Sequence, residues 1–319
     1  MYRYMKMAGY DLAKNCVLGI DIGGTNIRCG LIDNNYNIYF FQKENTHDVL
    51  SQGSDLALVL IRYIRNYCHT HLEDRLPLAV SIGFPSTINR QRTVVMQTPN
   101  IENVPNNFPL VELLERDLKI PVFVNRDVNF LMLFDLEDLN IADLNSVVGI
   151  YFGTGIGNAI YLNGKLLLGH NGVAAELGHL PIYGNKRVCS CGNTGCLETL
   201  ISGGTLHELQ RQFFPGTAIK NIFKEHKESP EIQEFISGLA QTVAIEVNIF
   251  DPDCVVVGGG LTHMEGFPKD EFVNIVRRYT RKPYPALNLE MRYSRASQKN
   301  GVIGAGIYAF KRIADPNYI

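Results

Sequence analysis

VLGIDIGGTNIRCGLIDN, at residues 17–34, is matched in pattern by VVGIYFGTGIGNAIYLNG at residues 147–164. The two stretches align without a gap at a constant offset, so that Gly153 lies over Gly23. Each has an apolar run, a glycine turn and a second apolar run, which is the pattern of a β-hairpin. The sequence therefore predicts an internal duplication in which each half contains such a hairpin.

Helical and strand patterns alternate through the rest of the chain. The stretch 49–71 is amphipathic, and LAVSIGF at 78–84 has the pattern of a buried strand. Helices are expected near 110–118 and 236–250, and a Gly-started helix near 301–310. These mixed elements predict an α/β protein of two lobes with a cleft between them.

The composition is typical of a globular chain with room for two domains, since 45% of the 319 residues are hydrophobic and 19% are charged. The formal net charge is −2, and lysine and arginine do not cluster. We therefore expect a small-molecule partner, with no nucleic acid and no membrane. Because the chain lacks a run of roughly eighteen apolar residues and a leader-like start, a cytoplasmic location is expected.

His179, Cys189, Cys191 and Cys196 form the strongest local signal, with the spacing H-x9-C-x-C-x4-C. One imidazole and three thiolates make up the closed tetrahedral ligand set of a structural zinc site. The alternative is a group of free thiols beside an unrelated histidine. Since protein groups fill all four positions, the metal is expected to shape a loop and not to activate water.

The two glycine turns could offer backbone N–H groups to phosphate oxygens, because glycine permits close approach. Either turn alone is more commonly an ordinary tight turn, and the duplication is what favours the phosphate interpretation. The first copy has Asp21 where the second has Tyr151. A lone carboxylate at a strand end suits Mg²⁺ held partly through water, although a hydrogen-bonding aspartate is the alternative. Neither turn fits the phosphate-loop or dinucleotide-binding patterns.

Three carboxylates complete the set of candidate residues. Asp127, in the segment NRDVN, follows a short strand pattern and precedes a helical one. It is either an ordinary first-turn aspartate or a general base for a substrate hydroxyl. Glu176 and Glu198 flank the predicted metal loop and could accept hydrogen bonds from a sugar, or could be solvated surface groups.

Six motifs follow one another along the chain: DIGGTNIR (21–28), NRDVN (125–129), GTGIG (153–157), HNGVAAELGH (170–179), CSCGNTGCLET (189–199) and VVVGGG (255–260). Together they resemble the ROK family of bacterial sugar kinases and repressors, part of the actin-like ATPase superfamily. The resemblance implies a two-domain actin-like ATPase fold, in which a ribonuclease H-like half is duplicated on either side of an interdomain cleft. It also implies ATP, Mg²⁺ and structural Zn²⁺, and a homodimer formed through the larger domain.

The resemblance implies a role for each matching residue. Asp127 would be the catalytic base, and Glu176, His179 and Glu198 would contact the sugar, with His179 also binding zinc. Phosphates would be held by Gly23, Gly24, Thr25, Gly153, Thr154 and Gly155, and Gly258 and Gly259 would lie near the adenosine.

Two departures from the family pattern bear on the substrate. Most family kinases have asparagine before the catalytic aspartate and a Gly-Pro-Gly stretch, where this chain has Arg126 and Phe84-Pro85-Ser86. Arg126 is therefore expected to border the sugar. Together with TPN at 98–100, these features resemble the D-allose kinase branch. We expect ATP-dependent conversion of D-allose to D-allose 6-phosphate, with glucose, fructose and N-acetylmannosamine as alternative substrates.

A non-catalytic sugar sensor is the competing class. About sixteen residues precede the first expected strand, which is too few for a helix-turn-helix domain. An aspartate placed to act as a base favours the kinase. We expect a small lobe of residues 1–123 and about 305–319, and a larger lobe of residues 124–304 that carries the zinc loop.

Overall fold

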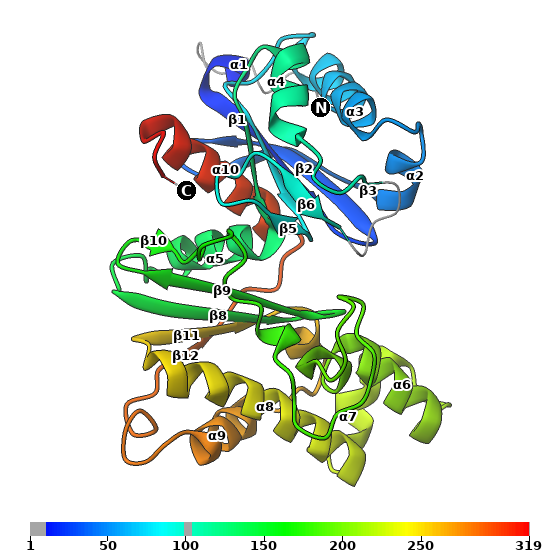
Figure 1. Ribbon diagram of the computed structural model, residues 1–319, viewed down its shortest axis with the longest axis vertical. Helices are drawn as coiled ribbons and strands as arrows, with labels where there is room; N and C mark the ends of the chain where they lie inside the picture. The colour runs from blue at the N-terminus through cyan, green and yellow to red at the C-terminus, as the bar shows by residue number, and fades with distance from the viewer. Residues whose placement is uncertain (1–10, 99–103, 319) are drawn as a thin grey trace. The chain divides into compact units, whose positions relative to one another are not determined.

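The computed structural model describes residues 11–98 and 104–318, which divide into two compact units (Figure 1). Pro99 and Asn100 of the expected substrate motif lie outside the described residues. The first unit runs to Asp138 and also takes in Leu168–Ala174 and the chain from Ser297 onward. The second unit comprises Leu139–Leu167 and Ala175–Ala296.

The first unit is built on a five-stranded sheet with the order β3-β2-β1-β4-β7. β1 pairs antiparallel with β2 and parallel with β4, while β3 is antiparallel to β2 and β7 is parallel to β4. The strands are β1 (Cys16–Ile22), β2 (Asn26–Asp33), β3 (Ile38–Asn45), β4 (Val80–Phe84) and β7 (Val122–Arg126). A separate two-stranded sheet joins β5 (Thr87–Ile88) to β6 (Val95–Gln97).

The second unit repeats this topology strand for strand, in the order β10-β9-β8-β11-β12. β8 is antiparallel to β9 and parallel to β11, β10 is antiparallel to β9, and β12 is parallel to β11. The strands are β8 (Ser146–Phe152), β9 (Ile156–Leu162), β10 (Lys165–Leu166), β11 (Cys254–Gly258) and β12 (Met291–Tyr293). The duplication predicted from the two glycine hairpins is confirmed, with β1 and β2 corresponding to β8 and β9.

Helices pack on both faces of the first sheet because its central strands are buried on both sides. One face packs with α3 and α4 in a large apolar cluster, and the other packs with α10. Asp55 starts α3 by accepting hydrogen bonds from two backbone N–H groups. The helices of this unit are α1 (Leu12–Asn15), α2 (Thr46–Leu50), α3 (Leu56–Leu72), α4 (Leu110–Leu118), α5 (Asp127–Asp138) and α10 (Asn300–Ala314).

The close packing of α5 on α10 decides where the first unit ends. A Cβ added at Gly304 of α10 would overlap the backbone carbonyl of Phe130 in α5, so the two helices meet at a glycine. The structure therefore assigns α5 and the whole of α10 to the first unit. Its boundaries at Asp138 and Ser297 differ from the expected limits of 123 and about 305.

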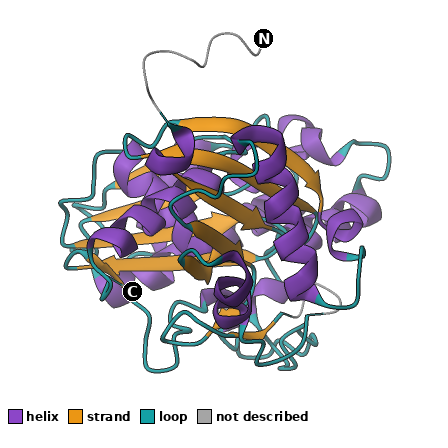
Figure 2. Cartoon of the chain, turned by 90° about the horizontal axis from the view of Figure 1, so that it is seen from above, coloured by secondary structure: helices purple, strands orange, loops and turns teal. Residues whose placement is uncertain are grey.

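The second unit has its own apolar core around α8. This helix begins after the N-cap Ser229 with a proline at its first position, which suits the fixed backbone angle of that residue. Figure 2 shows the helices of the chain beside its strands. The remaining helices are α6 (Gly203–Phe213), α7 (Ile222–His226), α8 (Pro230–Phe250) and α9 (Lys269–Tyr279), with 3₁₀ turns at η1 (Leu177–His179), η2 (Leu197–Thr199), η3 (Ile219–Asn221) and η4 (Leu261–His263).

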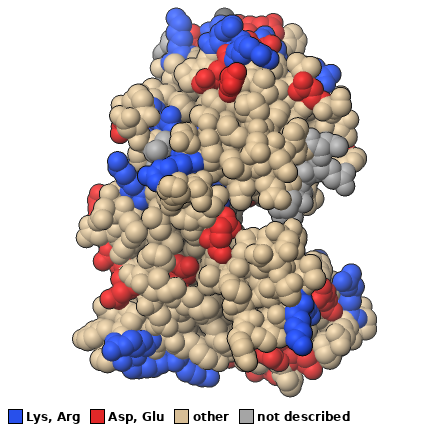
Figure 3. Space-filling model, viewed as in Figure 1, with Lys and Arg blue, Asp and Glu red and all other residues tan. Residues whose placement is uncertain are grey.

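The surface carries dispersed charge on the face drawn in Figure 3, where lysine and arginine side chains lie in separate small groups. Among the helices of residues 11–98 and 104–318, none combines the length and apolar character needed to cross a bilayer.

Candidate functional site

The glycine turn between β1 and β2 leaves two backbone amides open. The Gly23 N–H donates to the Asn26 carbonyl at 2.9 Å and closes the turn. Within the described chain, no hydrogen bond occupies the N–H groups of Gly24 and Thr25, and both residues are exposed. Neither Gly23 nor Gly24 has a positive φ. These glycines matter here because they have no side chain, so a ligand can approach the backbone closely.

The turn between β8 and β9 has the same property. The Gly153 N–H donates to the Gly155 carbonyl at 2.9 Å. The N–H groups of Thr154 and Gly155 have no hydrogen-bond acceptor in the described parts of the chain. The carbonyl side of this turn is bonded to the start of α6, where the Gly203 N–H donates to the Gly153 carbonyl at 2.9 Å. Each half thus presents a pair of unpaired amides, an arrangement suited to phosphate oxygens.

Glu198 lies against the second turn. Its Oε2 accepts a hydrogen bond of 2.7 Å from the Ile156 N–H. A Cβ at Gly155 would overlap this carboxylate oxygen, so a larger residue there would have to displace the Glu198 side chain. The sequence predicted that Glu198 lies beside the metal loop. It did not predict the contact with Ile156, because the two residues are far apart in the chain. The sugar-binding role of Glu198 stays a prediction.

Asp21 lies near the end of β1, close to the first turn. Its Oδ2 is 3.3 Å from Nη1 of Arg28, and its carboxyl group lies against Gly301 in the first turn of α10. Burial raises the pKa of the Asp21 carboxyl above its ordinary value, while the charge and hydrogen bond of Arg28 act in the opposite direction. Asp21 thus precedes the open amides of Gly24 and Thr25 by three and four residues in the sequence.

Asp127 is the first residue of α5, directly after β7 ends at Arg126. Its Oδ1 accepts a hydrogen bond of 2.7 Å from the Val128 N–H, which fixes one carboxylate oxygen at the start of the helix. The expected first-turn role is therefore present, and it is compatible with catalysis by the other oxygen.

Arg126 is largely buried, and its Nη1 donates to the Ala174 carbonyl at 2.8 Å. The sequence predicted that this guanidinium borders the sugar but missed its bond to the backbone of the 168–174 segment. Ser86 belongs to the Phe84-Pro85-Ser86 stretch that replaces Gly-Pro-Gly. It is also buried, and its hydroxyl lies 2.7 Å from that of Thr98.

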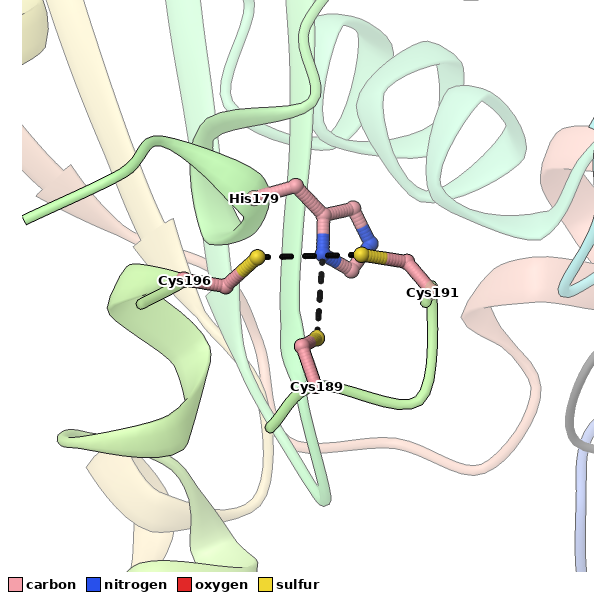
Figure 4. Close-up of side chains that lie close together, drawn as sticks. All are labelled: His179, Cys189, Cys191 and Cys196. Atoms are coloured by element: carbon pink, nitrogen blue, oxygen red, sulfur yellow. Dashed lines mark hydrogen bonds between the residues drawn. The ribbon is translucent and has the colours of Figure 1, made fainter. Parts of the chain in front are cut away.

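The four predicted metal ligands converge in the second unit (Figure 4). Their ligand atoms all lie within 4.8 Å of one another. Nδ1 of His179 is 3.6 Å from the Cys189 sulfur, and the Cys191 and Cys196 sulfurs are also 3.6 Å apart. Zinc bonds of about 2.0–2.3 Å arranged as a tetrahedron place neighbouring ligand atoms roughly 3.5–3.8 Å apart. The residues therefore fit a four-coordinate zinc ion.

The backbone of the loop explains how the thiols meet. Gly192 and Gly195 have φ of 94° and 90°, values that favour glycine. The Cys189 N–H donates to the Asn193 carbonyl at 2.8 Å. An antiparallel bridge joins Pro181 to Cys196. The loop is thus held by backbone hydrogen bonds as well as by its ligand set.

The thiols of the cluster differ in acidity. Burial, together with hydrogen bonds that the Cys196 thiol donates to the neighbouring sulfurs, raises the pKa of Cys196 to about 12. For Cys191, burial acts upward, but hydrogen bonds from the Asn193 N–H and the other thiols outweigh it and lower the pKa. Binding of a metal by all three sulfurs would therefore release protons.

The second imidazole nitrogen of His179 faces a carboxylate. Nε2 lies 3.8 Å from Oε2 of Glu176, and the two residues belong to the same short 3₁₀ segment. Because Nδ1 points to the sulfurs, Nε2 and Glu176 are left side by side as polar groups suited to hydroxyl ligands.

A pocket of about 360 Å³ includes in its lining Gly260, the residue that follows the predicted adenosine glycines. Gly258 ends β11 and Gly259 follows with a φ of 89°. The sequence did not predict the residues that line this pocket, because they come from separate elements and form no sequence motif. The pocket is lined by Lys220, Asn221, Gly260, His263, Met264 and Glu265.

The sequence of this chain is similar to those of known proteins. A model of the ROK family matches residues 17–312. A glucokinase from Thermotoga maritima is 28% identical over 270 residues, which cover 77% of this chain and 82% of the relative. An N-acetylmannosamine kinase from Salmonella typhi is 28% identical over 297 residues, which cover 92% of this chain and 97% of the relative.

A solved structure shows the same similarity in three dimensions. The crystal structure of a ROK family glucokinase from Streptomyces griseus, in complex with glucose and AMPPNP, matches with a TM-score of 0.75 and 25% identity. The match covers 91% of this chain and 98% of the other.

Proposed function

The chain belongs to the ROK family and is an ATP-dependent sugar kinase, and from this premise we propose that it phosphorylates the 6-hydroxyl of a hexose with Asp127 as general base. The actin-like ATPase fold expected from the sequence is confirmed. The observation that carries the proposal is the pair of glycine turns at matching positions of the two halves, each with two unpaired amides.

The chemistry follows from the groups present. The sugar oxygen attacks the γ-phosphorus of ATP while Asp127 accepts the hydroxyl proton, and the bond to the bridging oxygen breaks to release ADP. We assign the free amides of Gly24, Thr25, Thr154 and Gly155, together with the neighbouring Gly23 and Gly153, the role of stabilising negative charge on the phosphates. The Asp127 carboxylate, which accepts a hydrogen bond from the Val128 N–H at the start of α5, is the proposed acceptor of the hydroxyl proton.

Asp21 is the proposed contact for Mg²⁺. A single hard carboxylate suits this ion, which usually keeps several waters and takes its remaining ligands from substrate phosphates. When bound, the ion supplies positive charge against the phosphate oxygens. Arg28 binds Oδ2 of Asp21, and Oδ1 is the oxygen that we assign to a hydrated cation.

Glu176, His179 and Glu198 are the proposed sugar contacts. A carboxylate oxygen can accept two hydroxyl hydrogen bonds, so this set suits a polyol. Structural Zn²⁺ is proposed at His179, Cys189, Cys191 and Cys196, where it fixes the orientation of the imidazole. The pocket beside Gly258 and Gly259 is the proposed site of the adenosine.

D-Allose is the proposed substrate. The support is the sequence pattern of Arg126 and Phe84-Pro85-Ser86, which resembles the D-allose kinase branch whether or not Arg126 itself touches the sugar. The names of the relatives favour glucose or N-acetylmannosamine as alternatives. A site that hydrogen-bonds one hydroxyl epimer rejects another strongly, because the wrong epimer leaves buried polar groups unpaired.

A cytoplasmic homodimer completes the proposal. ATP as substrate and seven cysteines without a disulfide are consistent with a reducing compartment. The second unit exposes apolar side chains at Ile249, Tyr284 and Leu287, which a partner chain could cover.

The test is a coupled ADP-release assay on the purified protein with Mg-ATP and a sugar panel. The panel contains D-allose, D-glucose, D-fructose, D-mannose and the N-acetylated hexosamines. Turnover that is strongest on allose supports the full proposal, and turnover strongest on another sugar keeps the kinase but rejects the allose assignment. Tight sugar binding without turnover would instead favour the sensor.

A further inference from the structure

Three arginines hold the backbone of one short loop in the first unit. This loop, Leu168–Ala174, lies between β10 and the segment that carries Glu176 and His179. The loop is closed by a hydrogen bond of 3.0 Å from the Ala174 N–H to the Leu168 carbonyl. Arg90 donates to Gly169 at 3.2 Å, Arg92 to Gly172 at 2.9 Å and Arg126 to Ala174 at 2.8 Å.

The three arginines differ in burial and in their distance along the chain from Glu176. Arg90 is exposed, whereas Arg92 is 3% exposed and Arg126 is 9% exposed. A guanidinium bonded to a carbonyl in a buried setting is a strong, charge-assisted contact. Ala174, the partner of Arg126, is also the loop residue nearest in sequence to Glu176.

The residue after this contact has an unusual backbone. Ala175 has a φ of 64°, in the left-handed region that is strained for a residue with a Cβ. Such a conformation persists only where neighbouring contacts enforce it. Here the contact on the N-terminal side is the Arg126–Ala174 hydrogen bond, and Glu176 begins the next 3₁₀ turn.

We propose that Arg126 is a positioning residue that sets the place of Glu176 and His179 through Ala174, and does not select the sugar by direct contact. The inference rests on the proposed function, since these two residues are the assigned sugar contacts. Arg126 directly precedes Asp127, so one side chain links the strand that ends at the general base to the loop that leads to the sugar ligands.

The variants are chosen to separate this role from simple loss of stability. Arg126→Met keeps the length and apolar stem of the side chain but removes its hydrogen bonds, and Arg126→Lys keeps the charge and one donor. Arg90→Met is the matched control, because it removes an arginine–carbonyl bond at the other end of the same loop.

Sugar affinity is the first readout, measured by titration calorimetry and as KM across the panel. Loss of a charge-assisted hydrogen bond predicts that Arg126→Met weakens binding about tenfold or more. The factor should be similar for every sugar that binds, KM for ATP should stay within about twofold, and Arg126→Lys should recover part of the loss. Arg90→Met should bind sugar like the wild type.

A second variant tests the strained residue. Glycine adopts a positive φ freely, so Ala175→Gly should recover part of the sugar affinity in the Arg126→Met background. A role of Arg126 in stability alone would give no such rescue.

Hydrogen exchange of the sugar-free protein gives a readout that does not depend on activity. The amides of Ala174 and His179 donate to Leu168 and Glu176, so they report on the loop and the 3₁₀ turn. Exchange in the peptides over 168–179 should be faster in Arg126→Met and unchanged in Arg90→Met.

The outcomes separate this inference from the proposed function. Wild-type exchange or wild-type sugar affinity in Arg126→Met overturns the inference, and so does an affinity loss confined to one epimer, which would mean direct contact. An equal loss in Arg90→Met also overturns it. If the wild type phosphorylates no sugar, the proposed function fails, and the exchange experiment still decides whether Arg126 holds the loop.

Discussion

Asp127 combines two roles in one carboxylate. The oxygen bound by the Val128 N–H fixes the start of α5, and the other oxygen is the proposed proton acceptor. Position and chemistry therefore depend on the same side chain. A substitution that keeps the first role and removes the second can separate them.

Asp127→Asn is such a substitution. The amide oxygen can still accept from the Val128 N–H, but a neutral amide cannot take up the proton. We expect kcat to fall by about 10³-fold or more, with the circular dichroism spectrum and sugar affinity close to those of the wild type. Steady-state ADP release and calorimetry measure these quantities, and turnover near the wild-type rate would reject Asp127 as the base.

Alanine substitutions at Glu198 and Glu176 should differ in their effects on KM for ATP and KM for sugar. Because the Glu198 carboxylate holds the Ile156 N–H beside the second glycine turn, Glu198→Ala should weaken both ligands, raising KM for ATP and for sugar by about tenfold each. Glu176→Ala should raise KM for sugar alone. Measuring both constants for both variants checks this, and an unchanged KM for ATP in Glu198→Ala would show that the turn does not need this carboxylate.

Residue patterns in the sequence were informative for some contacts and not for others. The metal ligands lie within a short stretch, so their spacing alone predicted the cluster that the structure brings together. The contacts of Arg126 with Ala174 and of Glu198 with Ile156 join distant segments. No local pattern records such pairs, since they depend on how the elements pack.

At the scale of elements, the loop that carries His179, Cys189, Cys191 and Cys196 is held by backbone hydrogen bonds, and its one imidazole and three sulfurs are the proposed zinc ligands. The proposed metal replaces thiol–thiol contacts by bonds that fix the direction of His179. Loss of one sulfur should therefore affect both the stability of the loop and the sugar site.

Cys191→Ser tests the loop. Zinc per chain should fall from about one to near zero, since a closed site needs all four ligands, and sugar affinity should fall with it. Cys254→Ala is the control, because it removes a buried thiol of β11 outside the cluster. Elemental analysis reads the metal content, and a full complement of zinc in Cys191→Ser would contradict the assignment.

Helix α8 contains a buried carboxyl group at Glu246, which is 5% exposed. Burial raises the pKa of Glu246 to about 7. The folded state therefore binds this proton more tightly than the unfolded chain, whose glutamates titrate near 4.3. Stability linked to this group is fully present below that value and falls as the pH rises through about 7, by about 3–4 kcal/mol in all.

Glu246→Gln removes this titration. The free energies of unfolding of variant and wild type should be similar at pH 5, and the variant should be more stable by about 2–3 kcal/mol at pH 8. Glu234→Gln, an exposed position of the same helix, should show no such divergence. Urea denaturation at the two pH values measures the difference, and a constant offset between Glu246→Gln and wild type would contradict the effect.

At the scale of the whole molecule, duplication explains why two similar turns exist. The aligned hairpins of the sequence became β1–β2 and β8–β9, and each sheet then adds two parallel strands in the same order. This part of the fold was predictable because the repeat is visible in the sequence. The division between the units was not, because it depends on the packing of α5 against α10.

The most direct test of the central claim identifies the product. The purified protein is incubated with Mg-ATP and D-allose, and the sugar phosphate is examined by mass spectrometry and ³¹P NMR, with 6-deoxy-D-allose and the Asp127→Asn variant as controls. If allose does not react, the hexose that is most active in the panel takes its place, with its own 6-deoxy analogue. The account predicts a hexose 6-phosphate in step with ADP, and no product from the 6-deoxy sugar or the variant. Phosphorylation of a 6-deoxy sugar, or ADP release without sugar phosphate, would contradict it.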